Sequence, residues 1–176
     1  MQREGFDRSR LEFLPVSSRR SKLEMSEVAV DPETPAPDPG LAASVIDRAA
    51  ERIIEARKRG APVVLCHGAH LIRNGLAPLL GRMVEEGWLQ HIATNGAGSI
   101  HDWEFAFLGC TCEDVEEYVS SGQFGMWEET GRSIALALLV GAFDGLGYGH
   151  SIGRMIVEER IDVPAREELL AALEAG

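Results

Sequence analysis

Residues 62–104 read PVVLCHGAHLIRNGLAPLLGRMVEEGWLQHIATNGAGSIHDWE, and this stretch decides the fold. The short apolar run over 62–67 is typical of a strand buried on both faces, and 88–94 forms a second such run. Between them, residues 71–86 repeat apolar side chains at helical spacing and stop at Gly87, a favoured helix end. The segment has the length of one strand–helix–strand unit, so we expect the two strands to lie parallel.

Both predicted strands end in turns whose residue types suit a binding site. These residues are Gly68, Ala69 and His70 after the first strand, and Thr94, Asn95, Gly96, Ala97 and Gly98 after the second. Ligands bind at the carboxyl ends of strands in an open parallel sheet, so both turns should line one crevice. Glycine permits positive φ and close approach of a ligand, and the following helix adds its positive end. A tight turn that binds nothing is the alternative.

Three segments carry a family resemblance: GAHLIRNGL, HIATNGAGSIHDWE and SSGQFGMWEETG. Over residues 60–160 the chain resembles the amino-terminal half of the deoxyhypusine-synthase-like family, and is closest to its uncharacterised bacterial members. The resemblance implies a Rossmann-like α/β domain, with a parallel sheet flanked by helices, that binds NAD or a related nucleotide through the two turns. It also implies a transferase or oxidoreductase acting on a small amine or amino-acid-like substrate. Where the synthase's turns are rich in Thr and Ser, this chain has His67, His70 and His101.

Four residues are candidates for chemistry on a bound substrate. His101 and His70 follow predicted strand ends and are the candidate catalytic residues, since imidazole titrates near neutral pH. Helix capping by His70 and a solvated first-turn position for His101 are the alternatives. Asp102 and Glu104 are the candidate substrate-binding residues. Asp102 also completes a capping box with Ser99, whereas Glu104 would bind a ligand cation such as a polyamine.

A metal site is not expected. The spacing of Cys110 and Cys112 is not the C-x-x-C of a zinc ribbon, and there is no second pair. His67 is interpreted as a half-buried polar residue bonded to backbone, and Cys66 as part of the core. An odd number of cysteines, 3 in all, argues against a disulfide framework and for a reducing, cytoplasmic location.

The net charge of −11 argues against a nucleic-acid partner, because phosphate binding needs clustered Lys and Arg. No apolar run approaches the roughly 18 residues of a membrane helix, and the charged amino terminus shows no signal peptide. Residues 1–40 are predicted to be an extended arm with the proline-rich linker PETPAPDPG, which is either solvated or bound to the acidic body or to a neighbouring subunit. Residues 41–176 form the predicted domain.

The remaining patterns predict helices. The first spans 42–59 and is expected to pack on the sheet, and another begins at about Ile100. A short helix opens with a capping box at Thr111 and should turn Val115, Tyr118 and Val119 inward. The last three span 126–143, which should be buried on several sides, 150–159, and 164–174, with Pro164 in its first turn. GLGYG, residues 145–149, is interpreted as a loop rather than a phosphate cradle.

Two strands cannot cover so many helices. We therefore expect the chain to be the front half of a larger domain, or to complete its sheet with a partner chain or in a homo-oligomer. A non-catalytic half-domain is the alternative to an enzyme. The chain has only two lysines, Lys22 and Lys58, and neither lies in the resembling segment. Since the synthase reaction uses a desolvated lysine nucleophile, we expect no deoxyhypusine formation by this chain alone.

Overall fold

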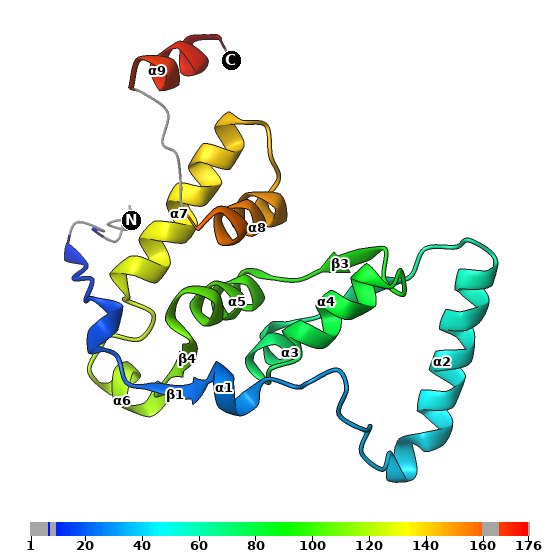
Figure 1. Ribbon diagram of the computed structural model, residues 1–176. Helices are drawn as coiled ribbons and strands as arrows, with labels where there is room; N and C mark the ends of the chain where they lie inside the picture. The colour runs from blue at the N-terminus through cyan, green and yellow to red at the C-terminus, as the bar shows by residue number, and fades with distance from the viewer. Residues whose placement is uncertain (1–6, 8–9, 160–165, 176) are drawn as a thin grey trace, which may run out of the picture. The chain divides into compact units, whose positions relative to one another are not determined.

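The computed structural model describes residues 7, 10–159 and 166–175. It divides into two compact units, one of Leu23–Thr111 and one of Met1–Lys22 together with Cys112–Gly176. Both contain helices, and the chain is of mixed α/β class (Figure 1). No single helix among the described residues is long and apolar enough to cross a membrane; α7 and α8 meet the test only as a pair, and they are bent by 113° at their junction.

A parallel pair of strands lies in the unit Leu23–Thr111. Strand β2 (Val64–Cys66) pairs with β3 (His91–Ala93), with Leu65 opposite Ile92. The parallel pairing is as predicted, but the strands are shorter than predicted and are not buried on both faces. Leu65 packs against the core, whereas Val64 is 53% exposed and Cys66 is exposed. Neighbouring residues of a strand face opposite sides, and only one side of β2 is covered by described residues. The expectation that Cys66 belongs to the core is therefore wrong.

The crossover contains two helices instead of the single helix predicted over 71–86. They are α3 (Ala69–Arg73) and α4 (Ala77–Glu85), and Figure 1 shows both. The break falls at Gly75, where φ is 79°, a value that favours glycine. The Gly75 carbonyl accepts a hydrogen bond from Val30 N at 2.9 Å, so a segment far back in the chain passes close by. This tertiary hydrogen bond lies at the residue where the helical pattern of 71–86 is interrupted.

The core of this unit is small and comes from several elements. Its four buried residues are Ile72, Leu80, Leu89 and Phe105. The last of these belongs to α5 (Gly96–Leu108). Leu23, Met25 and Val28 pack against this cluster; the last two belong to the short helix α1 (Met25–Val28). The segment before the proline-rich linker is therefore part of the folded unit.

Helix α2 (Ala43–Lys58) follows the 3-10 turn η3 (Gly40–Ala42) and matches the helix predicted over 42–59. None of its residues is buried, so the expectation that it packs on the sheet is wrong. Its apolar residues Val45 and Ile46 are 57% and 51% exposed. Propensity and helical spacing are enough to form the helix, but they do not supply the surface that would cover it.

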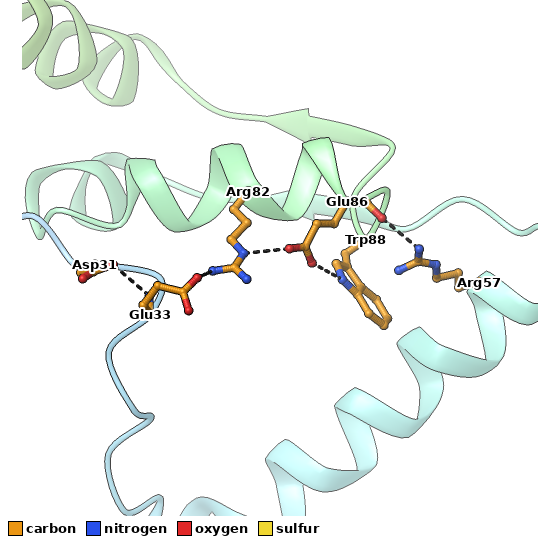
Figure 2. A network of polar contacts seen from close by, with 6 residues as sticks. All are labelled: Asp31, Glu33, Arg57, Arg82, Glu86 and Trp88. Atoms are coloured by element: carbon orange, nitrogen blue, oxygen red, sulfur yellow. Dashed lines mark hydrogen bonds and ion pairs between the residues drawn. The ribbon is translucent and has the colours of Figure 1, made fainter.

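A polar network joins the ends of α2 and α4 (Figure 2). Arg57 donates to the Glu86 carbonyl at 2.9 Å, and its guanidinium carbon lies 4.1 Å from the Trp88 ring centroid. The Glu86 carboxylate accepts from Arg82 Nε at 2.8 Å and from Trp88 Nε1 at 3.0 Å, while Arg82 also pairs with Glu33. The hydrogen bond from Arg82 lowers the pKa of Glu86, so its contribution to stability is present above its ordinary pKa and lost as pH falls.

The other unit has an aromatic cluster around Trp127, which is 3% exposed. Its indole Nε1 donates to Glu113 Oε2 at 2.8 Å. The Tyr118 ring meets it edge-on at 4.9 Å between centroids, and the Arg19 guanidinium carbon lies 5.7 Å from the ring centroid. The helices of this unit are η2 (Val16–Ser18), α6 (Val115–Ser120), α7 (Glu128–Phe143), α8 (Tyr148–Glu158) and α9 (Arg166–Ala175). The boundaries between the two units fall within the strands β1 (Ser21–Glu24) and β4 (Cys110–Glu113).

Residues 16–20 are held in this unit by backbone hydrogen bonds to side chains far along the chain. Val16 N donates to Glu129 Oε2 at 2.7 Å, and Arg20 N donates to Tyr118 Oη at 2.8 Å. This part of the predicted arm is therefore not a solvated tail. The domain boundary predicted near residue 40 stays a prediction.

Three details of the later helices differ from the predictions. Asp114, not Thr111, caps α6, because its carboxylate accepts from the backbone N–H groups of Glu116 and Glu117. Within α6 only Tyr118 is buried, and Val115 and Val119 are each 58% exposed. Helix α7 matches the predicted range but has exposed apolar residues such as Leu139, 68% exposed, so its expected burial on several sides is wrong for the described residues. GLGYG is a loop only up to Gly147, where α8 is capped, and Pro164 lies outside the described residues.

Candidate functional site

The two turns that follow β2 and β3 lie side by side, as predicted. His67 N donates to the Ala93 carbonyl at 2.9 Å, extending the pairing beyond the strands. A Cβ built on Gly68 would lie 3.8 Å from Asn95 Nδ2, and Thr94 Oγ1 lies 3.4 Å from His67 Nδ1. The two turns are therefore neighbours at the carboxyl edge of the parallel pair, and the ligand roles of their residues stay predictions.

Helix α5 begins in the second turn, earlier than predicted. Asn95 is the N-cap, and its side-chain oxygen accepts from Gly98 N at 3.2 Å. Ser99 instead donates its hydroxyl to the Gly96 carbonyl at 2.9 Å, so the capping box predicted from Ser99 to Asp102 is wrong. Asn is as good an N-cap as Ser, and the earlier of the two starts the helix here.

Close packing explains one of the two glycines in this turn. A Cβ on Gly98 would collide with Thr94 Oγ1, so the Thr94 side chain would have to shift for any other residue at this position. Neither Gly96 nor Gly98 has a positive φ, so the turn does not use the positive φ angles that glycine permits. Gly96 and Ala97 are exposed at the first turn of α5, where backbone N–H groups and the helix dipole favour an anion.

Asp102 is half-buried within α5, and it does not cap the helix. Burial raises its pKa, and the nearby positive charge of His67 partly opposes that rise. His67 was not among the predicted site residues; its position at the same strand end as Gly68 and His70 was the available signal. Its Nδ1 lies 3.0 Å from the Gly68 carbonyl, as expected for a polar residue bonded to backbone. His70 itself is exposed.

His101 and Glu104 belong to a second polar group, which includes Thr111 from β4. His101 Nδ1 lies 2.7 Å from Thr111 Oγ1, and Thr111 Oγ1 donates to Glu104 Oε2 at 2.5 Å. Thr111 is fully buried and Glu104 is 2% exposed, so both side chains are enclosed, and the ligand role of Glu104 stays a prediction. The sequence pattern missed Thr111, which was interpreted as a helix cap.

The three cysteines, all within the described residues, form no disulfide. Cys110 and Cys112 are half-buried in β4. In the described part of the chain, no group of three or more His, Cys, Asp or Glu side chains is arranged to hold a metal ion.

Replacing Asp102 with Asn should raise the free energy of unfolding at pH 7. Because burial raises the pKa of Asp102 above its ordinary value of 3.8, the folded state holds this proton more tightly than the unfolded state. The stability it contributes is greatest below the ordinary pKa and is lost as pH rises through the folded pKa. Urea unfolding of the parent protein and of Asp102→Asn from pH 4 to pH 8 measures the difference in their free energies of unfolding.

The matched control is Asp47→Asn, at an exposed aspartate of α2, which should leave the pH dependence unchanged. If Asp102→Asn is less stable than the parent protein at pH 7, a favourable interaction of the carboxylate outweighs its burial. A gain in stability at a position near the strand edge would fit a residue kept for function, since sites commonly sacrifice stability.

No family model, no curated protein and no solved structure matches this chain. The resemblance to the deoxyhypusine-synthase-like family therefore rests on the three sequence segments alone.

Proposed function

We propose that this chain is a Rossmann-like domain that binds NAD or a related nucleotide at the carboxyl edge of β2 and β3. The observation that carries the proposal is the side-by-side placement of the two turns after parallel strands, which is where nucleotides bind in open α/β sheets. Exposed Gly96 and Ala97 would face a phosphate group at the amino end of α5.

Side chains around this edge suit the two chemical parts of a nucleotide. Imidazoles of His67 and His70 would complement phosphate charge when protonated. The half-buried carboxyl of Asp102 would accept a hydrogen bond from a ribose hydroxyl. A carboxyl whose pKa is raised by burial, beside a histidine, is also typical of functional sites.

The reaction that fits the resemblance is transfer or oxidation of a small amine, and Asp102 and His101 are the residues proposed to take part in it. The aminobutyl transfer of the synthase itself is not proposed. Lys22 Nζ pairs with Asp114 Oδ2 at 2.7 Å, and Lys58 is exposed at the end of α2. Neither is the desolvated lysine that imine chemistry needs. Incubation with NAD, spermidine and acceptor protein should give no labelled product.

Replacing Gly96 with Val should abolish nucleotide binding while changing stability little. The branched side chain would cover the exposed N–H groups at the first turn of α5, and Gly96 does not need a positive φ. Isothermal titration calorimetry with NAD and with ADP-ribose measures the loss.

Gly81→Val is the matched control, since Gly81 is an exposed helical glycine of α4 with open space around it. It should bind like the parent chain. Equal nucleotide affinity of the Gly96 and Gly81 variants, or no binding by the parent chain, would contradict the proposal.

A second candidate is a subunit that completes its sheet with a partner chain. Val64 is 53% exposed on β2, and α2 exposes Val45, Ile46 and Ile54. A strand pair with one uncovered face is not expected to be stable alone. Light scattering coupled to gel filtration should then show an oligomer that Val64→Asp dissociates, whereas a monomer at every concentration would exclude a homo-oligomer.

A further inference from the structure

We infer that α2 of one copy of this chain packs on the outer face of the β2–β3 pair of a second copy, and that the exchange is reciprocal, so that two copies form a dimer. The outer face is the side of the strand pair away from the core, and Val64, Cys66 and His91 lie on it. Only the existence of an oligomer is taken from the second candidate function, and nucleotide binding is not required.

The outer face is largely apolar, and no described residue covers it. Leu65 and Ile92 are opposite one another in the register and pack against the core, so Val64, Cys66 and His91 point to the other side. Val64 is 53% exposed, and Cys66 and His91 are exposed as well. A two-stranded sheet needs another element packed against it to be stable.

Helix α2 has the surface that such a face needs. Its apolar side chains recur at a spacing of three or four residues, which places them on one stripe, and none of its 16 residues is buried. The stripe consists of Val45, Ile46, Ala49, Ala50, Ile53 and Ile54. The two alanines at its centre let a strand pair approach closely. In α/β domains, the faces of a parallel sheet are covered by helices.

The polar network of Figure 2 keeps α2 away from the outer face of its own strand pair. Arg57 donates to the Glu86 carbonyl and lies over the Trp88 ring, so the last turn of α2 is fixed at the end of α4. Leu80 of α4 belongs to the core, so α4 covers the inner side of the strand pair. With α2 held beside α4, the outer face is left for a second copy.

Charge and symmetry also favour a second copy as the occupant. Asp47 and Glu51 each follow a residue of the stripe, so they lie along one border of it. On the outer face, His91 is opposite Val64 in the register, and its imidazole N–H is a donor for these carboxylates. Each copy has one helix surface and one sheet surface, so two copies related by a two-fold axis make the same contact twice and leave neither surface uncovered.

Sedimentation equilibrium of the full chain over a range of concentrations should show a monomer–dimer equilibrium. Ile46→Glu puts a charge into the stripe and should give a monomer. Ser44→Glu, two residues away and on the opposite side of α2, should dimerise like the parent chain. Because no residue of α2 is buried in a single copy, neither change should alter the circular dichroism spectrum.

A parent chain that is monomeric at every concentration would overturn the inference. So would a dimer that Ile46→Glu leaves intact. If Val64→Asp dissociates that dimer, the sheet-completion candidate stands without the exchange of α2, so the two proposals fail separately.

The native thiol of Cys66 reports what covers the outer face. Its alkylation by a maleimide, located by peptide mapping, should slow as the parent dimer forms and should stay fast in Ile46→Glu. With copper phenanthroline as the oxidant, Ala50→Cys should form a disulfide to Cys66 that links two chains. A disulfide between the two introduced thiols would mean that α2 pairs with α2, and equal alkylation rates in monomer and dimer would mean that the outer face stays uncovered. Either result would overturn the inference.

Discussion

Replacing Trp127 with Ala is expected to lower the free energy of unfolding by about 3–5 kcal/mol, the usual cost of removing a large buried aromatic side chain. Trp127 is 3% exposed, and its ring contacts Tyr118 edge-on. Its removal also leaves the Glu113 carboxylate without the indole donor at 2.8 Å. Urea unfolding followed by circular dichroism measures the loss.

Two controls separate the parts of this effect. Trp127→Phe keeps an aromatic ring and removes the N–H, so it should cost about 1–2 kcal/mol. Trp88→Ala removes a half-buried indole at the end of α4 and should also cost less than Trp127→Ala. Amide exchange at Val16 and Arg20 should speed up in Trp127→Ala, since the acceptor of Arg20 is Tyr118, which contacts this ring, and the acceptor of Val16 is Glu129, two residues along the chain from Trp127. A loss no larger than that of Trp88→Ala would contradict the central place of Trp127.

The parallel pair and the meeting of its two turns were predictable because both are local. A strand, a crossover and a second strand lie within residues 62–94, and a crossover connection lets two successive strands pair in parallel. The turns at Gly68 and Asn95 meet as a direct result. Nothing beyond neighbouring elements is needed for this part of the fold.

The first residues of the helices were harder to predict, because the sequence contains several possible N-cap residues of similar strength. Asn95 and Ser99 are both good N-caps, as are Thr111 and Asp114. Which one is used depends on contacts that a capping pattern does not contain. One of these is the close approach of Gly98 to Thr94.

Burial was predicted least well. The apolar run that includes Val64 and Cys66 has the composition of a strand covered on both faces, but composition does not say which elements are present to cover it. The same holds for α2, whose helical spacing is correct and whose apolar residues are exposed.

The group formed by His101, Glu104 and Thr111 shows the limit of sequence patterns for sites. The spacing of His101 and Glu104 places them on one helix face, and that much is visible in the sequence. Thr111 joins them only because the chain reverses after Gly109. The glycine was a signal for the end of a helix, but not for the direction of the strand that follows.

Replacing Gly75 with Ala should cost about 2–5 kcal/mol, from two causes that a matched variant can separate. The first is backbone strain, because φ is 79° at Gly75 and a left-handed angle costs about 1–2 kcal/mol for a residue with a Cβ. The second is a collision, since the new Cβ would overlap the Val28 carbonyl oxygen, and overpacking costs about 1–3 kcal/mol.

Gly87→Ala introduces the backbone strain without the collision. At Gly87 φ is 71°, and a Cβ would meet nothing within 4 Å, so we expect a loss of about 1–2 kcal/mol from strain alone. Urea unfolding of the two variants gives the difference, which measures the packing of residues 28–30 against the break between α3 and α4. That segment is also held by the bond from Val30 N to the Gly75 carbonyl at 2.9 Å, so faster amide exchange at Val30 should accompany the larger loss. Equal losses in the two variants would mean that the segment yields to the added Cβ without cost, and the break would then follow from the φ angle of Gly75 alone.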